Sequence, residues 1–130
     1  MKPMPTLKTR CCGGSLTGTL PEPGLLCAYV LLKEAIARGA DVVATVCPLC
    51  QFNLDCYRDK MISKWGEETI PDPRNAGARI PVGPHLDIPV VFFTQLIGLA
   101  FGLTDKELGL QRGFTRLRRP ACARPQPAAA

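Results

Sequence analysis

Two cysteines that follow a short apolar run constrain this chain more than any other feature. Cys47 and Cys50 are separated by Pro48 and Leu49, and residues 41–46 before them are mostly apolar and β-branched. Such a run is typical of a buried strand, and Pro48 suits the first turn of a helix because its missing N–H would have no partner there. We therefore expect the pair where a strand ends and a helix begins. The free N–H groups and dipole of a helix start favour thiolates.

A second cysteine group lies upstream, where Cys11 and Cys12 are followed by Gly13 and Gly14. Adjacent side chains on a strand point to opposite faces, so neighbouring cysteines can serve one metal centre only where the backbone turns sharply. Glycine permits such a turn. The sequence therefore predicts an iron–sulfur cluster held by four thiols, those of Cys11, Cys12, Cys47 and Cys50.

Residue types alone leave other uses of these cysteines open. C-x-x-C pairs also occur in zinc sites and in redox-active dithiols. A metal-free thiol–disulfide enzyme would suit the strand–cysteine–helix order, and Pro89 stands before a later strand, but this reading gives Cys11 and Cys12 no role. Vicinal cysteines rarely close on one zinc ion, whereas a multi-iron cluster can take them on different iron atoms. A non-catalytic metal-binding or interaction domain that completes its site with another chain is the third alternative.

Cysteine content and charge narrow the class of protein. The chain has seven cysteines, an odd number, and its first residues lack the apolar segment of a signal peptide, which favours metal or redox use in a cytoplasmic protein over structural disulfides. Residues 88–103 are too short and too interrupted for a membrane span. Five arginines in the last nineteen residues account for the net charge of +5, so a nucleic-acid partner is not expected.

The order of predicted elements indicates an α/β fold with a small parallel sheet and flanking helices. We expect a helix over 22–38, a buried strand over 41–46 that is covered on both faces, the cysteine helix from 48 to about 64, and a second buried strand over 88–93. The first helix carries an apolar stripe at Leu25, Tyr29, Leu32 and Ile36.

Proline, glycine and helix-capping residues mark the boundaries of the other predicted elements. Residues 66–84 are rich in proline and glycine and are expected to form an irregular connector. Thr94 is predicted to cap a helix over 95–101, and Thr104 with Glu107 fits a capping box that starts one or two further turns of helix. We assign residues 1–113 to one cysteine-rich domain and 114–130 to a disordered tail rich in Arg, Pro and Ala.

Several other polar or sulfur-bearing residues have simpler explanations than a role in the site. Cys27 is predicted to be a core residue, Cys56 a structural one, Cys122 inert in the tail, and His85 a solvated loop residue. The side chains of three further residues are predicted either to hydrogen-bond cluster sulfurs or substrate, or to cap helices and fill polar contacts: Gln51, Asn53 and Gln95.

Three segments together resemble the second cysteine-rich (CCG) repeat of the B-type subunit of heterodisulfide reductase. They are Cys-Cys-Gly-Gly at 11–14, Cys-Pro-Leu-Cys-Gln-Phe-Asn-Leu-Asp at 47–55, and Pro-Val-Val-Phe-Phe-Thr-Gln-Leu-Ile-Gly-Leu-Ala at 89–100. The resemblance covers roughly residues 7–112. It implies a noncubane [4Fe-4S] cluster, with Cys11, Cys12, Cys47 and Cys50 matching cluster ligands, and a disulfide substrate cleaved between two such clusters. It also implies partner subunits, an iron–sulfur C-type subunit and a flavin A-type subunit.

The chain departs from that family at its start. The family motif begins with a further cysteine some three to four dozen residues before Cys-Cys-Gly, and a whole first repeat precedes it, whereas only ten residues precede Cys11 here. We therefore expect the chain to correspond to the C-terminal half of a subunit, as a fragment, a split gene product or the result of a misplaced start. A separate chain that carries the first CCG repeat is accordingly an expected partner.

Overall fold

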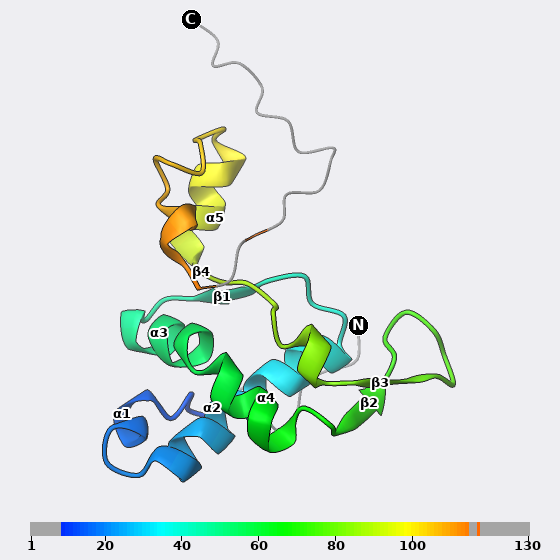
Figure 1. Ribbon diagram of the computed structural model, residues 1–130. Helices are drawn as coiled ribbons and strands as arrows, with labels where there is room; N and C mark the ends of the chain where they lie inside the picture. Colours follow the sequence, from blue (N-terminus) through cyan, green and yellow to red (C-terminus); the bar gives the residue numbers. More distant parts are fainter. Residues whose placement is uncertain (1–8, 115–116, 118–130) are drawn as a thin grey trace, which may run out of the picture.

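The computed structural model describes residues 9–114 and Leu117 (Figure 1). The predicted disordered tail lies almost wholly outside the described residues, as does Cys122. The elements follow in the order α1 Gly14–Thr17, α2 Pro21–Ala37, β1 Val43–Thr45, α3 Pro48–Cys56, α4 Arg58–Trp65, β2 Thr69–Pro71, β3 Arg79–Pro81, η1 Gly83–His85, β4 Val90–Phe92, α5 Phe93–Ala100 and η2 Leu110–Arg112.

Helix α2 provides one side of the hydrophobic core. It starts at Pro21 and ends before Gly39, whose backbone has a φ of 70° and whose N–H donates to the Ile36 carbonyl at 2.9 Å. The predicted apolar stripe is confirmed, since all its members are buried: Leu25, Tyr29, Leu32 and Ile36. Because stripe residues recur every three or four positions, they share one face of the helix.

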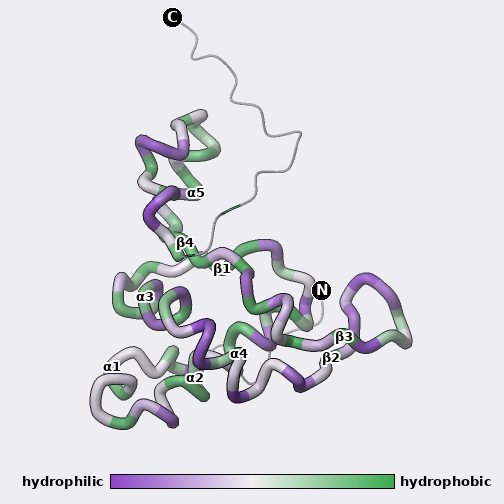
Figure 2. Tube along the Cα trace, in the orientation of Figure 1, coloured by the Kyte–Doolittle hydropathy of each residue, from purple (hydrophilic) through white to green (hydrophobic). Residues whose placement is uncertain are grey.

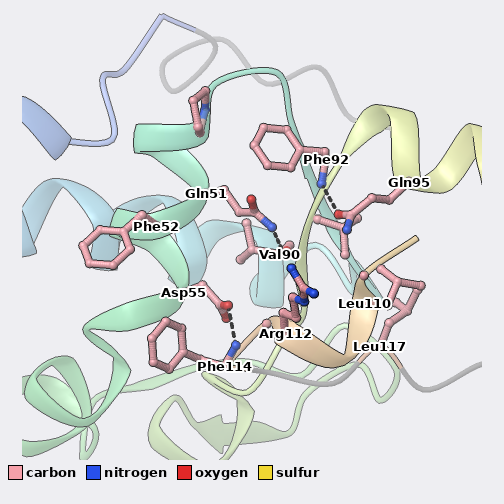
Figure 3. Close-up of a pocket in the computed structure, with 14 residues that line it drawn as sticks. Gln51, Phe52, Asp55, Val90, Phe92, Gln95, Leu110, Arg112, Phe114 and Leu117 are labelled. Carbon is pink, nitrogen blue, oxygen red and sulfur yellow. Dashed lines mark hydrogen bonds between the residues drawn. The ribbon is translucent and has the colours of Figure 1, made fainter. Parts of the chain in front are cut away.

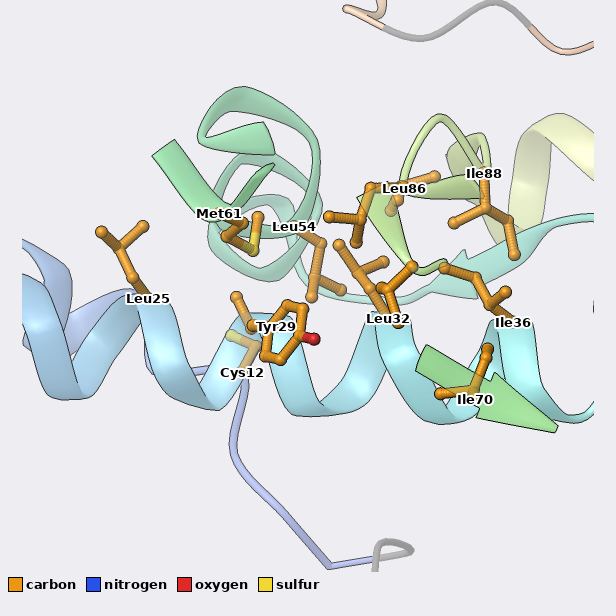
Figure 4. Packing of buried hydrophobic residues seen from close by; sticks show 13 residues of the cluster. Cys12, Leu25, Tyr29, Leu32, Ile36, Leu54, Met61, Ile70, Leu86 and Ile88 are labelled. Atoms are coloured by element: carbon orange, nitrogen blue, oxygen red, sulfur yellow. The ribbon is translucent and has the colours of Figure 1, made fainter. Parts of the chain in front are cut away.

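The α2 stripe packs against α3, α4 and the segment that leads into β4 (Figure 4). Leu54 and Met61 lie opposite the middle of α2, and Tyr29 stacks on Trp65 with 4.9 Å between ring centroids. The Tyr29 hydroxyl donates to the Trp65 carbonyl at 3.2 Å. Each large side chain buried in this way stabilises the fold by about 1.5–3 kcal/mol.

The predicted parallel pairing of the two apolar strands is confirmed. β1 runs parallel to β4, with Val43 opposite Val90 and Thr45 opposite Phe92. The expectation that the first strand is covered on both faces was wrong, because Ala44 is exposed. Within the described part of the chain β1 has β4 as its one strand neighbour, so it forms an edge of the sheet.

The proline-rich connector contains regular structure that the sequence did not predict. β2 and β3 form an antiparallel hairpin in which Ile70 pairs with Ile80, and Ile70 reaches the core. The prolines stand at the strand ends, Pro71 and Pro81, where a missing N–H interrupts few ladder bonds. The hairpin is followed by the 3-10 turn η1.

The cysteine helix, predicted as one element to about residue 64, is broken at Tyr57. Tyr57 has φ −99° and ψ 22°, so α3 ends and α4 begins there. The break accompanies a buried arginine: Arg58 lies 3.2 Å from Asp55 and donates hydrogen bonds to the Leu86 and Ile88 carbonyls. Arg58 thus ties the start of α4 to the segment before β4.

The α5 region, which we define as residues 93–108, projects from the rest of the molecule (Figure 1). Phe92 rather than the predicted Thr94 is the N-cap residue, and its N–H donates to the Gln95 side chain at 2.8 Å. The predicted capping box is confirmed: the Thr104 N–H donates to Glu107 Oε2 at 2.8 Å, and the Glu107 N–H donates to Thr104 Oγ1 at 3.3 Å. The α-helix expected to start at this capping box was wrong, because residues 105–109 form turns and the short 3-10 helix η2 follows.

Apolar residues recur along this projecting segment (Figure 2). Within the described range, no helix combines the length and the apolar character that crossing a bilayer requires.

Candidate functional site

The C-x-x-C pair lies where a strand gives way to a helix, as the sequence predicts. Cys47 is the N-cap residue of α3 and has extended backbone angles, and Pro48 occupies the first helical position. The Gln51 N–H donates to the Cys47 carbonyl at 3.0 Å, which starts the helical hydrogen bonding. Cys50 therefore lies in the first turn, near the N–H groups that a helix start leaves unpaired.

The two vicinal cysteines occupy a turn immediately before α1. Gly13 has a φ of 76°, a left-handed conformation that other residues adopt only with strain. Cys12 is buried with 6% of its surface exposed, whereas Cys11 is exposed, and the Gly13 N–H lies 3.4 Å from Cys11 Sγ. The turn thus places one of the two neighbouring residues, Cys12, in the protein interior and the other, Cys11, at the surface.

Sulfurs from the two cysteine groups meet. Cys12 Sγ lies 3.1 Å from Cys50 Sγ, although the residues are 38 positions apart. Hydrogen bonds from the Cys50 N–H, the Cys50 thiol and the Leu49 N–H hold the pKa of Cys47 below its usual value. The hydrogen bond with Cys12, together with burial, raises the pKa of Cys50. Three of the four predicted ligands are therefore linked through hydrogen bonds, while the contact recorded for the Cys11 sulfur is with the Gly13 N–H.

Close packing of α1 on α2 fixes the loop that carries Cys12. A Cβ added to Gly24 of α2 would come within 2.7 Å of the Thr17 backbone nitrogen, and one on Gly13 would come within 2.6 Å of the Gly24 carbonyl oxygen. Real Cβ atoms do not approach this closely, so the two helices can touch only through glycine. This contact is the second way, besides the Gly13 turn, in which glycine shapes the site.

Asn53 joins the two halves of the site through hydrogen bonds. Its side-chain Nδ2 donates to the Cys12 carbonyl at 2.6 Å, and its Oδ1 accepts from the Thr17 hydroxyl at 2.7 Å. The sequence predicted either a bond to cluster sulfur or substrate, or a cap or polar contact, and Asn53 fills a polar contact with a backbone carbonyl and a hydroxyl. No sequence pattern indicated a role for Thr17. For Asn53 the spacing was a signal, because it follows Cys50 by three residues and therefore shares its helix face.

A cavity of about 270 Å³ lies on the other side of α3 (Figure 3). Gln51, Phe52 and Asp55 line it, together with β4 and the chain around Arg112 and Phe114. The backbone N–H of Phe114 donates to Asp55 Oδ2 at 2.8 Å. These α3 positions face away from Cys50 and Asn53, so the cavity and the cysteine cluster are separate features.

The two remaining glutamines hold backbone groups and do not contact the cysteine sulfurs. Gln51 Nε2 lies 3.4 Å from the Val90 carbonyl. Gln95 accepts from the Phe92 N–H and donates to the Leu108 carbonyl at 2.8 Å. Both therefore fill polar contacts, which was one of the two roles predicted for them.

Comparison with known families identifies the cysteine-bearing part of the chain. Residues 2–55 match the profile of the CCG family, described as "Cysteine-rich domain". This match covers less than half of the chain. The matched segment includes the turn of Cys11 and Cys12 and the first turn of α3, and so contains every cysteine of the predicted ligand set.

Curated relatives of this chain are named as subunits of reductases. The 8-methylmenaquinol:fumarate reductase membrane anchor subunit of Wolinella succinogenes is 30% identical over 79% of this chain and 30% of that protein. The B-type subunit of the ferredoxin:CoB-CoM heterodisulfide reductase of Methanosarcina mazei is 25% identical over 82% of this chain and 31% of its own length. The D-type subunit of the dihydromethanophenazine:CoB–CoM heterodisulfide reductase from that organism is 37% identical over 40% of this chain and 13% of its own.

These matches confirm the predicted resemblance to heterodisulfide reductase subunits, at low sequence identity. The chain spans less than a third of the length of each of these relatives. No solved structure matches it significantly.

Three further cysteines and the one histidine were assigned no role in the site by the sequence. Cys27 is half-buried on α2, and a Cβ added to Gly13 would come within 2.9 Å of its Cβ. Cys56 is half-buried at the end of α3. His85 is exposed in η1, as predicted. Cys122 was predicted to be inert and lies outside the described residues.

Proposed function

We propose that this CCG domain forms part of an iron–sulfur redox site that transfers electrons to or from a disulfide substrate. The observation that carries the proposal is the contact between Cys12 and Cys50, because it joins the two halves of the motif at their sulfur atoms. We propose a noncubane [4Fe-4S] cluster as the cofactor, with four thiolates as its ligands: Cys11, Cys12, Cys47 and Cys50.

The donor set fits such a cluster better than it fits a single ion. Among residues 9–114, no three His, Cys, Asp or Glu side chains are grouped closely enough to hold one metal ion. Iron–sulfur clusters bind thiolates on separate iron atoms and so need a wider set of sulfurs. The exposed thiol of Cys11 beside the buried thiol of Cys12 agrees with a centre of that width.

The residues of the site supply position and electrostatics. When bound, a cluster of this kind supplies one-electron transfers. The N–H groups of Leu49 and Cys50 stabilise negative charge on the Cys47 sulfur. Burial of Cys12 keeps water from its sulfur. Reduction of a disulfide takes up two electrons and two protons and yields two thiols, so the electrons must come from a partner.

We propose that the electrons pass through subunits like those of the relatives. All three relatives are named as subunits, and two of them belong to heterodisulfide reductases. The proposed partners are an iron–sulfur C-type subunit and a flavin A-type subunit, together with a chain that carries another CCG repeat. The proposed substrate is a small-molecule disulfide.

Iron analysis of the chain tests this function. After anaerobic reconstitution with ferrous iron and sulfide, we expect a brown protein with about four irons and four sulfides per chain. Cys12→Ser and Cys50→Ser should each lose most of the iron and change the electron paramagnetic resonance spectrum. Cys56→Ser, six residues beyond Cys50, is the matched control and should retain both. Full iron content in the Cys12→Ser, Cys50→Ser double variant would overturn the proposal.

A metal-free thiol–disulfide enzyme is the second candidate. It is favoured by the same short distance between Cys12 and Cys50, since two thiols in contact can be oxidised to a disulfide. The reconstitution separates the two: a colourless chain that binds no iron yet exchanges its thiols with a small disulfide supports the second candidate and rejects the first.

A further inference from the structure

Asn53 is a buried polar residue whose position suits a specific task. Only 1% of its surface is exposed, and it lies on α3 beside Leu54 of the core. A buried amide without partners would destabilise the fold, so its hydrogen bonds are the reason that it can occupy this place. Both of its bonds go to the segment that carries Cys12: one to the Cys12 carbonyl and one to Thr17.

The orientation of the amide follows from its partners. A carbonyl oxygen can only accept, so the group that faces Cys12 must be the NH₂ of Asn53. The carbonyl oxygen of Asn53 then faces the Thr17 hydroxyl at 2.7 Å, and that hydroxyl also lies 2.9 Å from the Gly13 carbonyl. A side chain at this position must donate and accept at once. Leucine matches the size of asparagine but can do neither.

The bonds of Asn53 bear directly on the sulfur contact. Residue 12 touches α3 twice, through its carbonyl at Asn53 and through its sulfur at Cys50. Cys50 and Asn53 are three residues apart, so they are neighbours on one helix face. Holding the carbonyl of Cys12 against Asn53 therefore limits how far its sulfur can move from Cys50.

We propose that Asn53 is a positioning residue that, with Thr17, holds Cys12 against Cys50 so that the two thiols act as one site. The inference deepens the proposed function because it concerns the same cysteines. Its first test needs no cluster, so the two can fail separately.

The test measures how close the two thiols are held in the metal-free chain. Purified chain is treated with a chelator and equilibrated with reduced and oxidised glutathione. Cys12 and Cys50 lose two protons and two electrons to form a disulfide, while glutathione disulfide is reduced to two thiols. Alkylation and peptide mass spectrometry give the fraction of Cys12–Cys50 disulfide, from which the effective concentration of the thiol pair follows.

We expect Asn53→Leu to lower this effective concentration about tenfold, the effect of losing a buried hydrogen bond of typical strength. Thr17→Val should lower it as well, and Thr17→Ser, which keeps the hydroxyl, should restore it. Asn75→Leu, at an exposed turn position, is the matched control and should leave it unchanged. Circular dichroism checks that each variant is folded.

The outcomes separate the two proposals. An effective concentration within twofold of the parent in both Asn53→Leu and Thr17→Val would overturn the positioning role, whatever the iron content. An effective concentration lowered as much in Thr17→Ser as in Thr17→Val would also overturn the positioning role, because the hydroxyl would then be irrelevant. A response of the thiols to Asn53→Leu in a chain that binds no iron would support the positioning role while the proposed function fails.

Discussion

The apolar stripe of helix α2 is buried in the body of the molecule, residues 11–92, whereas the apolar residues of the α5 region are partly or largely exposed. In the body, Leu32 of α2 is fully buried under α3, α4 and the chain before β4. In the α5 region, Phe93, Ile97 and Phe101 also recur every four residues, yet they are 45%, 48% and 83% exposed. A Cβ on Gly98 would contact Leu103 and Leu108, so α5 packs on the turn that follows it.

The comparison separates two properties that a hydrophobic stripe combines. Periodicity determines which side chains share a helix face, but neighbouring elements determine whether that face is buried. In α2 both conditions are met, and the cysteine site is built on the result. We therefore expect substitutions in the body to affect stability strongly and those in the α5 region to affect it little.

The largest effect is expected at Arg58. In Arg58→Leu, Asp55 Oδ1 would lose its ion-pair partner and the Leu86 and Ile88 carbonyls would lose the arginine that donates to them, and breaking a buried ion pair costs about 3–5 kcal/mol. Urea denaturation followed by circular dichroism measures the change in the free energy of unfolding. Arg79→Leu, at an exposed position in the hairpin, should cost less than about 1 kcal/mol. Equal losses in the two variants would contradict a special role for Arg58.

A smaller effect is expected where α1 touches α2. Gly24→Ala places a methyl group against the Thr17 backbone and should cost about 1–3 kcal/mol of unfolding free energy. Gly18→Ala is the matched control, because nothing lies within 4 Å of its added Cβ. Thermal denaturation of the pair checks the prediction. If Gly24→Ala is as stable as Gly18→Ala, the close approach of the two helices is not as described.

The smallest effect is expected in the α5 region. Phe101→Ala removes a largely exposed ring and should change the unfolding free energy by less than about 0.5 kcal/mol. Leu32→Ala removes a smaller side chain from the body and should cost about 2–5 kcal/mol. Chemical denaturation of both variants sharpens the comparison directly. A large loss in Phe101→Ala would mean that the α5 region is part of the core.

Local patterns were sufficient to predict part of this architecture. The stripe from Leu25 to Ile36 and Cys47 at a helix start follow from patterns within short segments, and the parallel pairing of the strands follows from the order of the elements. The sequence predicted that the two cysteine groups come close in space, and Cys12 Sγ does lie 3.1 Å from Cys50 Sγ. That these two cysteines, with Cys11 and Cys47, are ligands of one cluster stays a prediction.

Features that depend on distant partners could not be predicted in this way. The β2–β3 hairpin is stabilised by Ile70 in the core, which outweighs the turn-forming composition around it. The break at Tyr57 accompanies the contacts of Arg58 with residues about thirty positions away. Asn53 was noticed, but its bond to the Cys12 carbonyl depends on how α1 packs, which no local pattern encodes.

The contact between Cys12 and Cys50 has a consequence for folding. The segment between these residues contains α1, α2 and β1, and therefore the longest core helix. Any covalent bridge between the two sulfurs would close this segment into a loop. The bridge would lower the entropy of the unfolded chain and so stabilise the folded state by about 4 kcal/mol. Ligation at the site and the folding of α2 are thereby thermodynamically linked.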